Sequence, residues 1–144
     1  MRIYLDVCCY NRPFDDLTQL RVRLEAEAVL ALLSLVRENG WVLVSSDVVD
    51  LELSNMTNLT KRNKVMELCH LAQERILTTE SIANRADELQ TFGFKALDSF
   101  HIAISESSDV DILFSTDDKL VKLSDRLSLS VRIVNPLEWL PEVL

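Results

Sequence analysis

Four acidic side chains lie at positions from which an open α/β sheet would bring carboxylates to one edge. Asp6 ends the apolar run RIYLD, and Asp117 follows VDILFST. Glu52 ends the run WVLVSSDVVDLE, and Asp98 lies in the helix-like segment KALDSFHIAI. In such sheets the ligand site lies beyond the carboxyl ends of the strands. Acids this far apart in sequence are therefore candidates for one metal site.

Carboxylates in this number suit the hydrolysis of phosphodiesters. The reaction needs a nucleophilic water, neutralisation of charge on the phosphate oxygens and stabilisation of the leaving oxygen, all of which hard cations supply. Mg²⁺ and Mn²⁺ prefer oxygen ligands, and Mg²⁺ retains several waters while using only a few carboxylates. Without metal the carboxylates repel one another, so at least one is expected to have a raised pKa.

Each acid alone also has a structural explanation. Asp98 could favour a helix dipole, Asp6 could cap a turn and Glu52 could be a solvated surface acid. His101, three residues after Asp98, is interpreted as a packing or hydrogen-bonding residue, because no second His or Cys has the spacing of a metal ligand. Substitution of His101 by Gln is accordingly expected to affect mainly stability. Only the four acids taken together favour a metal site.

Composition indicates one compact domain over residues 1–144. With 144 residues and 48% hydrophobic residues, the chain can build a real core, since a chain of this size buries roughly 68–70% of its unfolded surface. The sequence has no stretch of about 20 apolar residues and no signal-peptide pattern at MRIYLD, so a soluble, cytoplasmic protein is expected. Cys8, Cys9 and Cys69 have neither a zinc spacing nor a disulfide framework, and are interpreted as apolar fillers.

The net charge of −8 argues against broad electrostatic attraction to nucleic acid, because affinity for phosphates comes mostly from Lys and Arg. The one dense basic stretch, residues 61–64, is best explained as a solvated helix face. Arg12 has two open explanations, which are contact with a phosphate and an ion pair with Asp15 or Asp16. Any polyanion must therefore be bound locally.

Short β-rich runs alternate with longer helical patterns, which predicts a mainly parallel sheet with helices on its faces. Strands are predicted over residues 2–6, 41–46, 75–79, 110–115 and 131–135, and helices over 17–38, 51–53, 61–73, 81–91 and 96–107.

The first long helix has its own start and stop signals. Asp16 with Gln19 resembles a capping box, and Gly40 is expected to be the C-cap. Its apolar stripe is predicted to comprise Leu20, Leu24, Ala28, Ala31 and Leu35. A spare apolar face that includes Val29 and Leu33 is expected to be available for self-association.

At this point the chain resembles a known family, the PIN-domain nucleases, which include the VapC-like toxins of bacterial toxin-antitoxin pairs. The resemblance rests on YLDVCCYNRP, VVDLELSN, KALDSFHIA and FSTDDKLVK, in family order over nearly the whole chain. It implies an α/β fold, a Rossmann-like α/β/α sandwich whose acidic pocket binds Mg²⁺ or Mn²⁺ and cuts single-stranded RNA. It further implies a homodimer and an antitoxin partner.

The resemblance places the catalytic acids on Asp6, Glu52, Asp98 and Asp117. Asp6, Asp98 and Asp117 would hold metal, while Glu52 completes the site or positions water. Asp118 is the alternative fourth acid, but Leu120 fits the large apolar residue that usually follows three positions after Asp117. Thr116 or Ser115 corresponds to the family's hydroxyl residue. Cys8 departs from the pattern, because related chains often carry Asn or Ser there.

Two other function classes remain open on sequence grounds. One is a catalytically weak or inactive PIN-fold module that binds RNA or protein, which Cys8 and the acidic composition leave possible. The other is a phosphoacceptor receiver domain, but such a domain needs an aspartate after the middle strand and a lysine after the last, and neither is found where needed.

Overall fold

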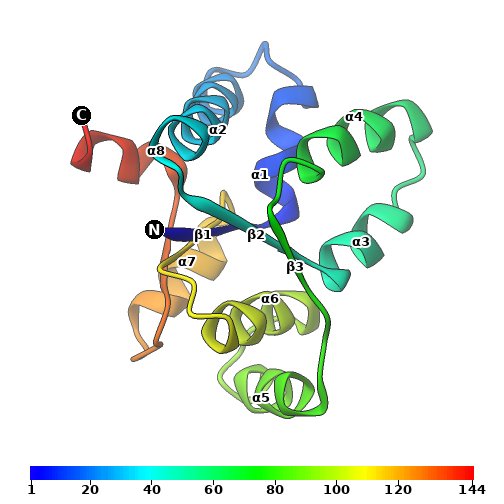
Figure 1. Cartoon of the computed structure of the whole chain (residues 1–144), viewed down its shortest axis with the longest axis vertical. Coiled ribbons are helices and arrows are strands. Elements are labelled where there is room, and N and C mark those ends of the chain that lie inside the picture. Colours follow the sequence, from blue (N-terminus) through cyan, green and yellow to red (C-terminus); the bar gives the residue numbers. More distant parts are fainter.

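All five strands of the protein form one parallel sheet, in the order β3-β2-β1-β4-β5. The computed structural model describes residues 1–144 (Figure 1). The strands are β1 Arg2–Leu5, β2 Val42–Ser46, β3 Glu74–Ile76, β4 Ile112–Phe114 and β5 Arg132–Val134. The predicted strands are thus confirmed, although each is shorter than expected and β3 begins one residue earlier.

Helices cover both faces of this sheet, as an all-parallel sheet requires. They are α1 Val7–Asn11, α2 Leu20–Asn39, α3 Asp47–Ser54, α4 Leu59–Cys69, α5 Glu80–Thr91, α6 Ala96–Ser107, α7 Asp118–Asp125 and α8 Pro136–Trp139, with short 3-10 turns at Arg12–Phe14 and Leu140–Glu142. In Figure 1, α1, α2 and α4 lie on one side of the sheet and α5 and α6 on the other. The predicted α/β/α architecture is therefore correct.

The pairing of β1 with its two neighbours, β2 and β4, aligns the carboxyl ends of β1 and β4. Leu5 at the end of β1 is paired with Phe114 at the end of β4, and Tyr4 is paired with Val44 of β2. Residues that follow Leu5 and Phe114 must therefore emerge side by side at one edge.

The core is centred on β1. Ile3, Tyr4 and Leu5 are fully buried, because helices cover the central strand on both sides. Burial of each such aliphatic side chain stabilises the fold by roughly 1.5–3 kcal/mol. This strand is consequently a rigid support for the residue that follows it, Asp6.

The ends of α2 agree only in part with the sequence patterns. Gly40 is the predicted C-cap, with φ 65°, and its amide donates to the Val36 carbonyl. The predicted capping box is wrong. Asp16 instead accepts hydrogen bonds from the amide and hydroxyl of Thr18, and the helix begins after Gln19, whose side chain caps nothing.

The apolar stripe predicted for α2 is also wrong in most of its members. Leu20 is 60% exposed and Leu24 is 39% exposed, whereas the buried apolar residues are Ala26, Ala28, Val29, Leu32 and Val36. Val29 is therefore unavailable for self-association. The prediction failed because this leucine-rich helix has apolar residues on several faces, so spacing alone selects more than one stripe.

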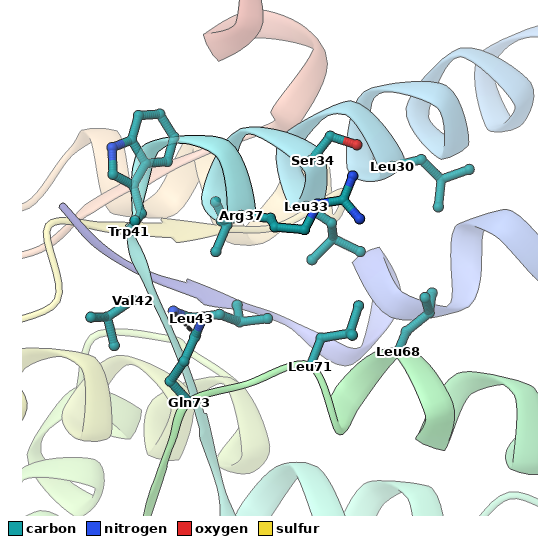
Figure 2. Close-up of a pocket in the computed structure, with 12 residues that line it drawn as sticks. Leu30, Leu33, Ser34, Arg37, Trp41, Val42, Leu43, Leu68, Leu71 and Gln73 are labelled. Carbon is teal, nitrogen blue, oxygen red and sulfur yellow. Dashed lines mark hydrogen bonds between the residues drawn. The ribbon is translucent and has the colours of Figure 1, made fainter.

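A groove lies between the C-terminal part of α2, the start of β2 and the segment after α4. It encloses about 660 Å³ and is lined mainly by apolar side chains, with Arg37 at one side (Figure 2). Gln73 is tied into its wall, because its side-chain oxygen accepts from the Leu43 amide at 2.8 Å. The groove adjoins Trp41 and Val42 at the start of β2, which is the end of the strand opposite the acidic edge.

None of the helices is both long enough and apolar enough to cross a lipid bilayer.

Candidate active site

Asp6 emerges directly from the carboxyl end of β1 and is only 6% exposed. Its amide donates to the Phe114 carbonyl at 3.0 Å, which extends the β1–β4 pairing by one residue. Its Oδ2 accepts a hydrogen bond from the Ser115 hydroxyl at 3.0 Å. Asp6 is thus a buried residue that is fixed by Phe114 through its backbone and by Ser115 through its carboxylate.

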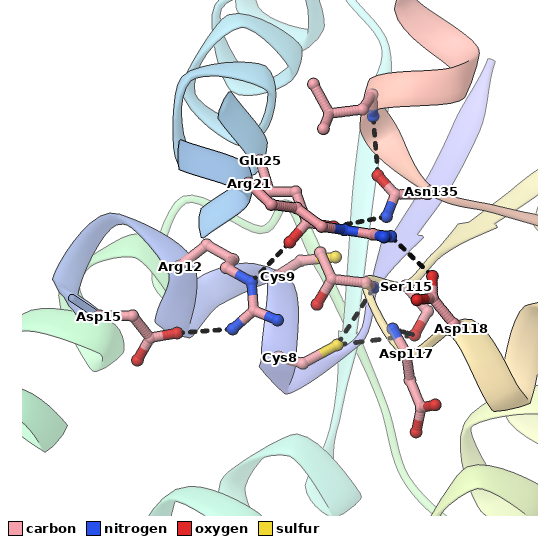
Figure 3. A network of polar contacts seen from close by, with 12 residues as sticks. Cys8, Cys9, Arg12, Asp15, Arg21, Glu25, Ser115, Asp117, Asp118 and Asn135 are labelled. Carbon is pink, nitrogen blue, oxygen red and sulfur yellow. Dashed lines mark hydrogen bonds and ion pairs between the residues drawn. The ribbon is translucent and has the colours of Figure 1, made fainter. Parts of the chain in front are cut away.

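Asp117 lies at the same edge, as the N-cap of α7. Its Oδ1 accepts from the amides of Lys119 at 3.0 Å and Leu120 at 3.3 Å. Its own amide donates to the Ser115 hydroxyl oxygen at 3.1 Å, and Figure 3 shows Ser115 and Asp117 side by side. Since Ser115 also donates to Asp6, one serine connects Asp117 with Asp6.

The neighbouring Asp118 has a different environment. Its side chain is 54% exposed and pairs with Arg21 of α2 at 2.7 Å (Figure 3). The Asp118 carboxylate is thus engaged at the surface by Arg21, whereas the charge of Asp117 acts on Asp98. Asp117 is therefore the better candidate for a shared site.

Asp98 is the third residue of α6, and its pKa responds to the other acids. Burial, together with the negative charges of Asp6, Asp117 and Glu52, raises the pKa of Asp98 to about 6, while His101 acts in the opposite direction. This is the raised pKa expected for carboxylates that share a site without metal. Asp98 therefore lies near enough to Asp6, Asp117 and Glu52 for their charges to act on it.

Glu52, on α3, is hydrogen-bonded to Nε2 of His101. One potential ligand atom from each of Asp6, Glu52 and His101 lies within 4.8 Å of the other two, so this trio could hold a metal ion. Asp98 and Asp117, which were predicted from the sequence as metal ligands, do not belong to this trio. Glu52 is consequently closer to the centre of the site than expected.

Both ring nitrogens of His101 are engaged. Nδ1 is hydrogen-bonded to the Tyr4 hydroxyl at 2.6 Å, while Nε2 faces Glu52. Burial lowers the pKa of His101, but the bond to Glu52 and the charges of Asp6 and Asp98 outweigh that effect and leave the pKa raised. His101 is thus a hydrogen-bonding residue, as expected, but it also offers a potential metal-ligand atom beside Asp6 and Glu52, which was not expected.

Sequence reasoning missed the partners of this histidine. Tyr4 precedes Asp6 by two residues, and residues i and i+2 of a strand share a face. A tyrosine buried in a strand also needs a partner for its hydroxyl. Those two signals together indicate a polar network beside Asp6.

Cys8 occupies the position where the resemblance leads one to expect Asn or Ser. Its sulfur lies 3.5 Å from the Ser115 hydroxyl oxygen and accepts from the Thr116 amide at 3.4 Å. Of the two candidate hydroxyl residues, only Ser115 contacts an acid of the site, because the Thr116 hydroxyl is buried without a partner. Cys8 therefore supports the loop that carries Ser115.

Arg12 takes part in ion pairs within the chain. It contacts Asp15 at 2.7 Å and Glu25 at 3.0 Å (Figure 3). Glu25 is 1% exposed and also accepts from Asn135 at 2.6 Å. Of the two explanations for Arg12, the ion pair is correct, with Asp15 as the expected partner and Glu25 as an unexpected one.

Comparison with known proteins rests on structure, since no family model and no curated protein matches the sequence. FitAcB from Neisseria gonorrhoeae superimposes with a TM-score of 0.62 at 18% identity, over 93% of this chain and 97% of that one. VapBC2 from Rickettsia felis, bound to a DNA fragment from their promoter, gives a TM-score of 0.65 at 12% identity, over 94% and 98% of the two chains. The chain has a VapC-like PIN-domain fold. At these identities the likeness shows the fold alone, so the chemistry of the chain rests on its own residues.

Proposed function

We propose that this PIN domain is a divalent-metal-dependent endoribonuclease that hydrolyses single-stranded RNA. The observation that carries the proposal is that ligand atoms of Asp6, Glu52 and His101 lie within 4.8 Å of one another, while Ser115 links Asp6 with Asp117. The raised pKa of Asp98, to which the charges of Asp6, Asp117 and Glu52 contribute, supports the inclusion of Asp98 in this set. Ligand sites of open α/β sheets lie at the carboxyl edge of the sheet. The VapC-like fold agrees with a nuclease role.

The donor set fits Mg²⁺ or Mn²⁺. Four carboxylates supply the hard oxygen ligands that these ions prefer, and uncompensated negative charge at Asp98 is what a bound cation would neutralise. We propose Asp6, Asp98 and Asp117 as the metal-holding residues, in preference to the trio of Asp6, Glu52 and His101, because both ring nitrogens of His101 are already engaged by Tyr4 and Glu52. When bound, the metal would supply charge neutralisation at the phosphate and a water activated for in-line attack.

The remaining steps belong to side chains of the protein. Glu52 has one oxygen on His101 and its other oxygen without a protein partner, so it can orient the attacking water and accept its proton. Ser115 fixes the direction of the Asp6 carboxylate through its hydroxyl. We therefore propose Asp6, Glu52, Asp98 and Asp117 as the catalytic set.

Single-stranded RNA suits this site better than a duplex. The acids lie at an edge where Asp6 is buried and Glu52 is only partly exposed, so a scissile phosphate must bend inward, which a stiff duplex resists. Because the chain carries a net charge of −8, RNA is expected to bind weakly, through the metal and a few local cations. Added salt should therefore inhibit cleavage.

We further propose that the protein is a cytoplasmic toxin with an antitoxin partner and that it forms a homodimer. The likeness to VapBC2, bound to promoter DNA, supports the first part. A small DNA-binding protein encoded in the neighbouring reading frame is expected. Light scattering that reports a monomer at high concentration would remove the dimer.

The test of the activity is single-turnover cleavage of a mixed RNA pool with Mg²⁺ or Mn²⁺, comparing the wild type with Asp98→Asn. The variant should be slower by several orders of magnitude and remain folded. Identical residual cleavage would indicate contamination. It would favour the second candidate, an inactive RNA- or protein-binding module, which Cys8 in place of a polar auxiliary residue also favours.

A further inference from the structure

One hydrogen-bonded network joins three of the segments that carry the acids. The Tyr4 hydroxyl on β1 lies 2.6 Å from the Ser46 hydroxyl at the end of β2 and 2.6 Å from Nδ1 of His101 on α6. Nε2 of His101 then reaches Glu52 on α3. Ser46 is itself the N-cap of α3, since its oxygen accepts from the Val49 amide at 3.2 Å. The network therefore contacts α3 twice, at its N-cap Ser46 and at Glu52.

The donors and acceptors of this network can be ordered in one direction. Ser46 accepts from the Val49 amide, which leaves its hydroxyl hydrogen for the Tyr4 oxygen. The Tyr4 hydroxyl can then donate to Nδ1 of His101, so that the Nε2 hydrogen points at the Glu52 carboxylate. In this order every hydrogen has one acceptor, and the proton of neutral His101 lies on Nε2.

Burial makes the arrangement rigid. Tyr4, Ser46 and His101 are fully buried, and the rings of Tyr4 and His101 lie with their centroids 5.4 Å apart. Glu52, by contrast, is partly exposed, with a side-chain exposure of 21%. A partly exposed glutamate would otherwise sample several rotamers, because solvent satisfies its oxygens in each of them.

We propose that His101 is a positioning residue, which aims the Glu52 carboxylate at the reacting water and is itself aimed by Tyr4 and Ser46. This proposal rests on the proposed nuclease function. It replaces the expectation that His101 matters mainly for stability. His101 acts through Glu52 and contacts neither the substrate nor the scissile phosphate.

The central test is a double-mutant cycle on RNA cleavage with His101→Leu and Glu52→Ala. His101→Leu should lower kcat by about 10- to 100-fold with little change in KM, as loss of a group that orients a site residue typically does. In the Glu52→Ala background the same substitution should change kcat by less than about 3-fold, because its target is gone. His70→Leu, at the exposed other histidine, is the matched control and should leave kcat unchanged. Equal losses in both backgrounds would overturn the proposal.

Two conservative variants guard against a folding defect in His101→Leu. His101→Gln keeps an amide donor and should recover much of the lost kcat, whereas a merely structural role would not favour Gln over Leu. Tyr4→Phe removes only the hydroxyl and should lower kcat less than His101→Leu does. Wild-type kcat in a folded Tyr4→Phe variant together with no rescue by Gln would contradict the proposal.

A proton NMR measurement tests the positioning without RNA. The Nε2 proton of buried His101 should give a downfield signal that is protected from solvent exchange, because its acceptor is a carboxylate. Glu52→Ala should shift the signal upfield, and His70→Leu should leave it in place. A signal indifferent to Glu52→Ala overturns the positioning, whereas wild-type protein that cleaves no RNA refutes the nuclease function, so the two failures are distinguishable.

Discussion

The Ser115 hydroxyl donates to Oδ2 of Asp6 across 3.0 Å and so joins the carboxyl ends of β1 and β4. The same oxygen accepts from the amide of Asp117 at 3.1 Å. One small side chain therefore holds the carboxylate of Asp6 and the backbone of Asp117, two residues that are more than 100 positions apart in the sequence. The relationship makes Ser115 part of the support for the proposed metal site.

Replacement of Ser115 by Ala should weaken Mn²⁺ binding by about 10- to 100-fold, which is the usual cost of losing a partner that orients a ligand. The substitution removes the donor to Asp6 and leaves the backbone of the loop in place. Calorimetric titration with Mn²⁺ measures the change, and Ser128→Ala, at an exposed position, is the control. Unchanged affinity in Ser115→Ala would show that Asp6 does not need this hydrogen bond.

Asp6 itself is expected to be indispensable for metal binding. Mn²⁺ should raise the Tm of the wild type modestly, because an ion that binds only the folded state stabilises it by mass action. Asp6→Asn should remove most of this rise and most of the calorimetric binding. Equal Mn²⁺ binding by the wild type and the variant would exclude Asp6 as a ligand.

The stability of the metal-free protein should depend on pH through Asp98. The folded state raises the pKa of Asp98 from its ordinary 3.8 to about 6, mainly by burial. Between these values the unfolded chain has lost the proton that the folded chain still holds, so stability falls as pH rises through this window and stays lower above it. Below it, both states are protonated and the penalty vanishes.

The change from 3.8 to about 6 in the pKa of Asp98 corresponds to at most about 3 kcal/mol, which solvent screening of this partly exposed group reduces to about 1 kcal/mol. Asp98→Asn should therefore raise the Tm of the metal-free protein at pH 7.5 by roughly 2–4 °C, the change that about 1 kcal/mol produces in a chain of this size. The gain should disappear below about pH 4, where Asp98 is neutral in both states. Thermal melts across this pH range provide the measurement. A gain that is the same at every pH would have to come from packing and not from charge.

Local signals in the sequence determined much of this fold. Gly40 ends α2 in the left-handed conformation, and α6 spans Ala96–Ser107 as predicted, because glycine caps and apolar helical spacing act over a few residues. The same local reasoning failed for Leu20 and Leu24, which face solvent. Which face of a leucine-rich helix is buried depends on what packs against it, and that information is not local.

In the site, too, local features could be predicted from the sequence and contacts between distant segments could not. The position of Asp6 after a strand was readable, whereas the pairing of His101 with Tyr4 and Glu52 joins three distant segments. No spacing rule predicts such a network, because its geometry depends on strand order and on the register between β1 and β2.

The adjacent acids Asp117 and Asp118 offer the sharpest comparison between site and surface. Asp117→Asn keeps the side-chain oxygen that caps α7, since Asn is as good an N-cap as Asp, so stability should change little while metal-dependent cleavage falls by orders of magnitude. Asp118→Asn removes only an exposed ion pair with Arg21, so it should cost at most about 1 kcal/mol of stability and leave cleavage near the wild-type rate. Single-turnover RNA cleavage and thermal melts of the two variants, measured side by side, decide the matter. If Asp118→Asn abolished cleavage and Asp117→Asn did not, the fourth acid of the site would be Asp118.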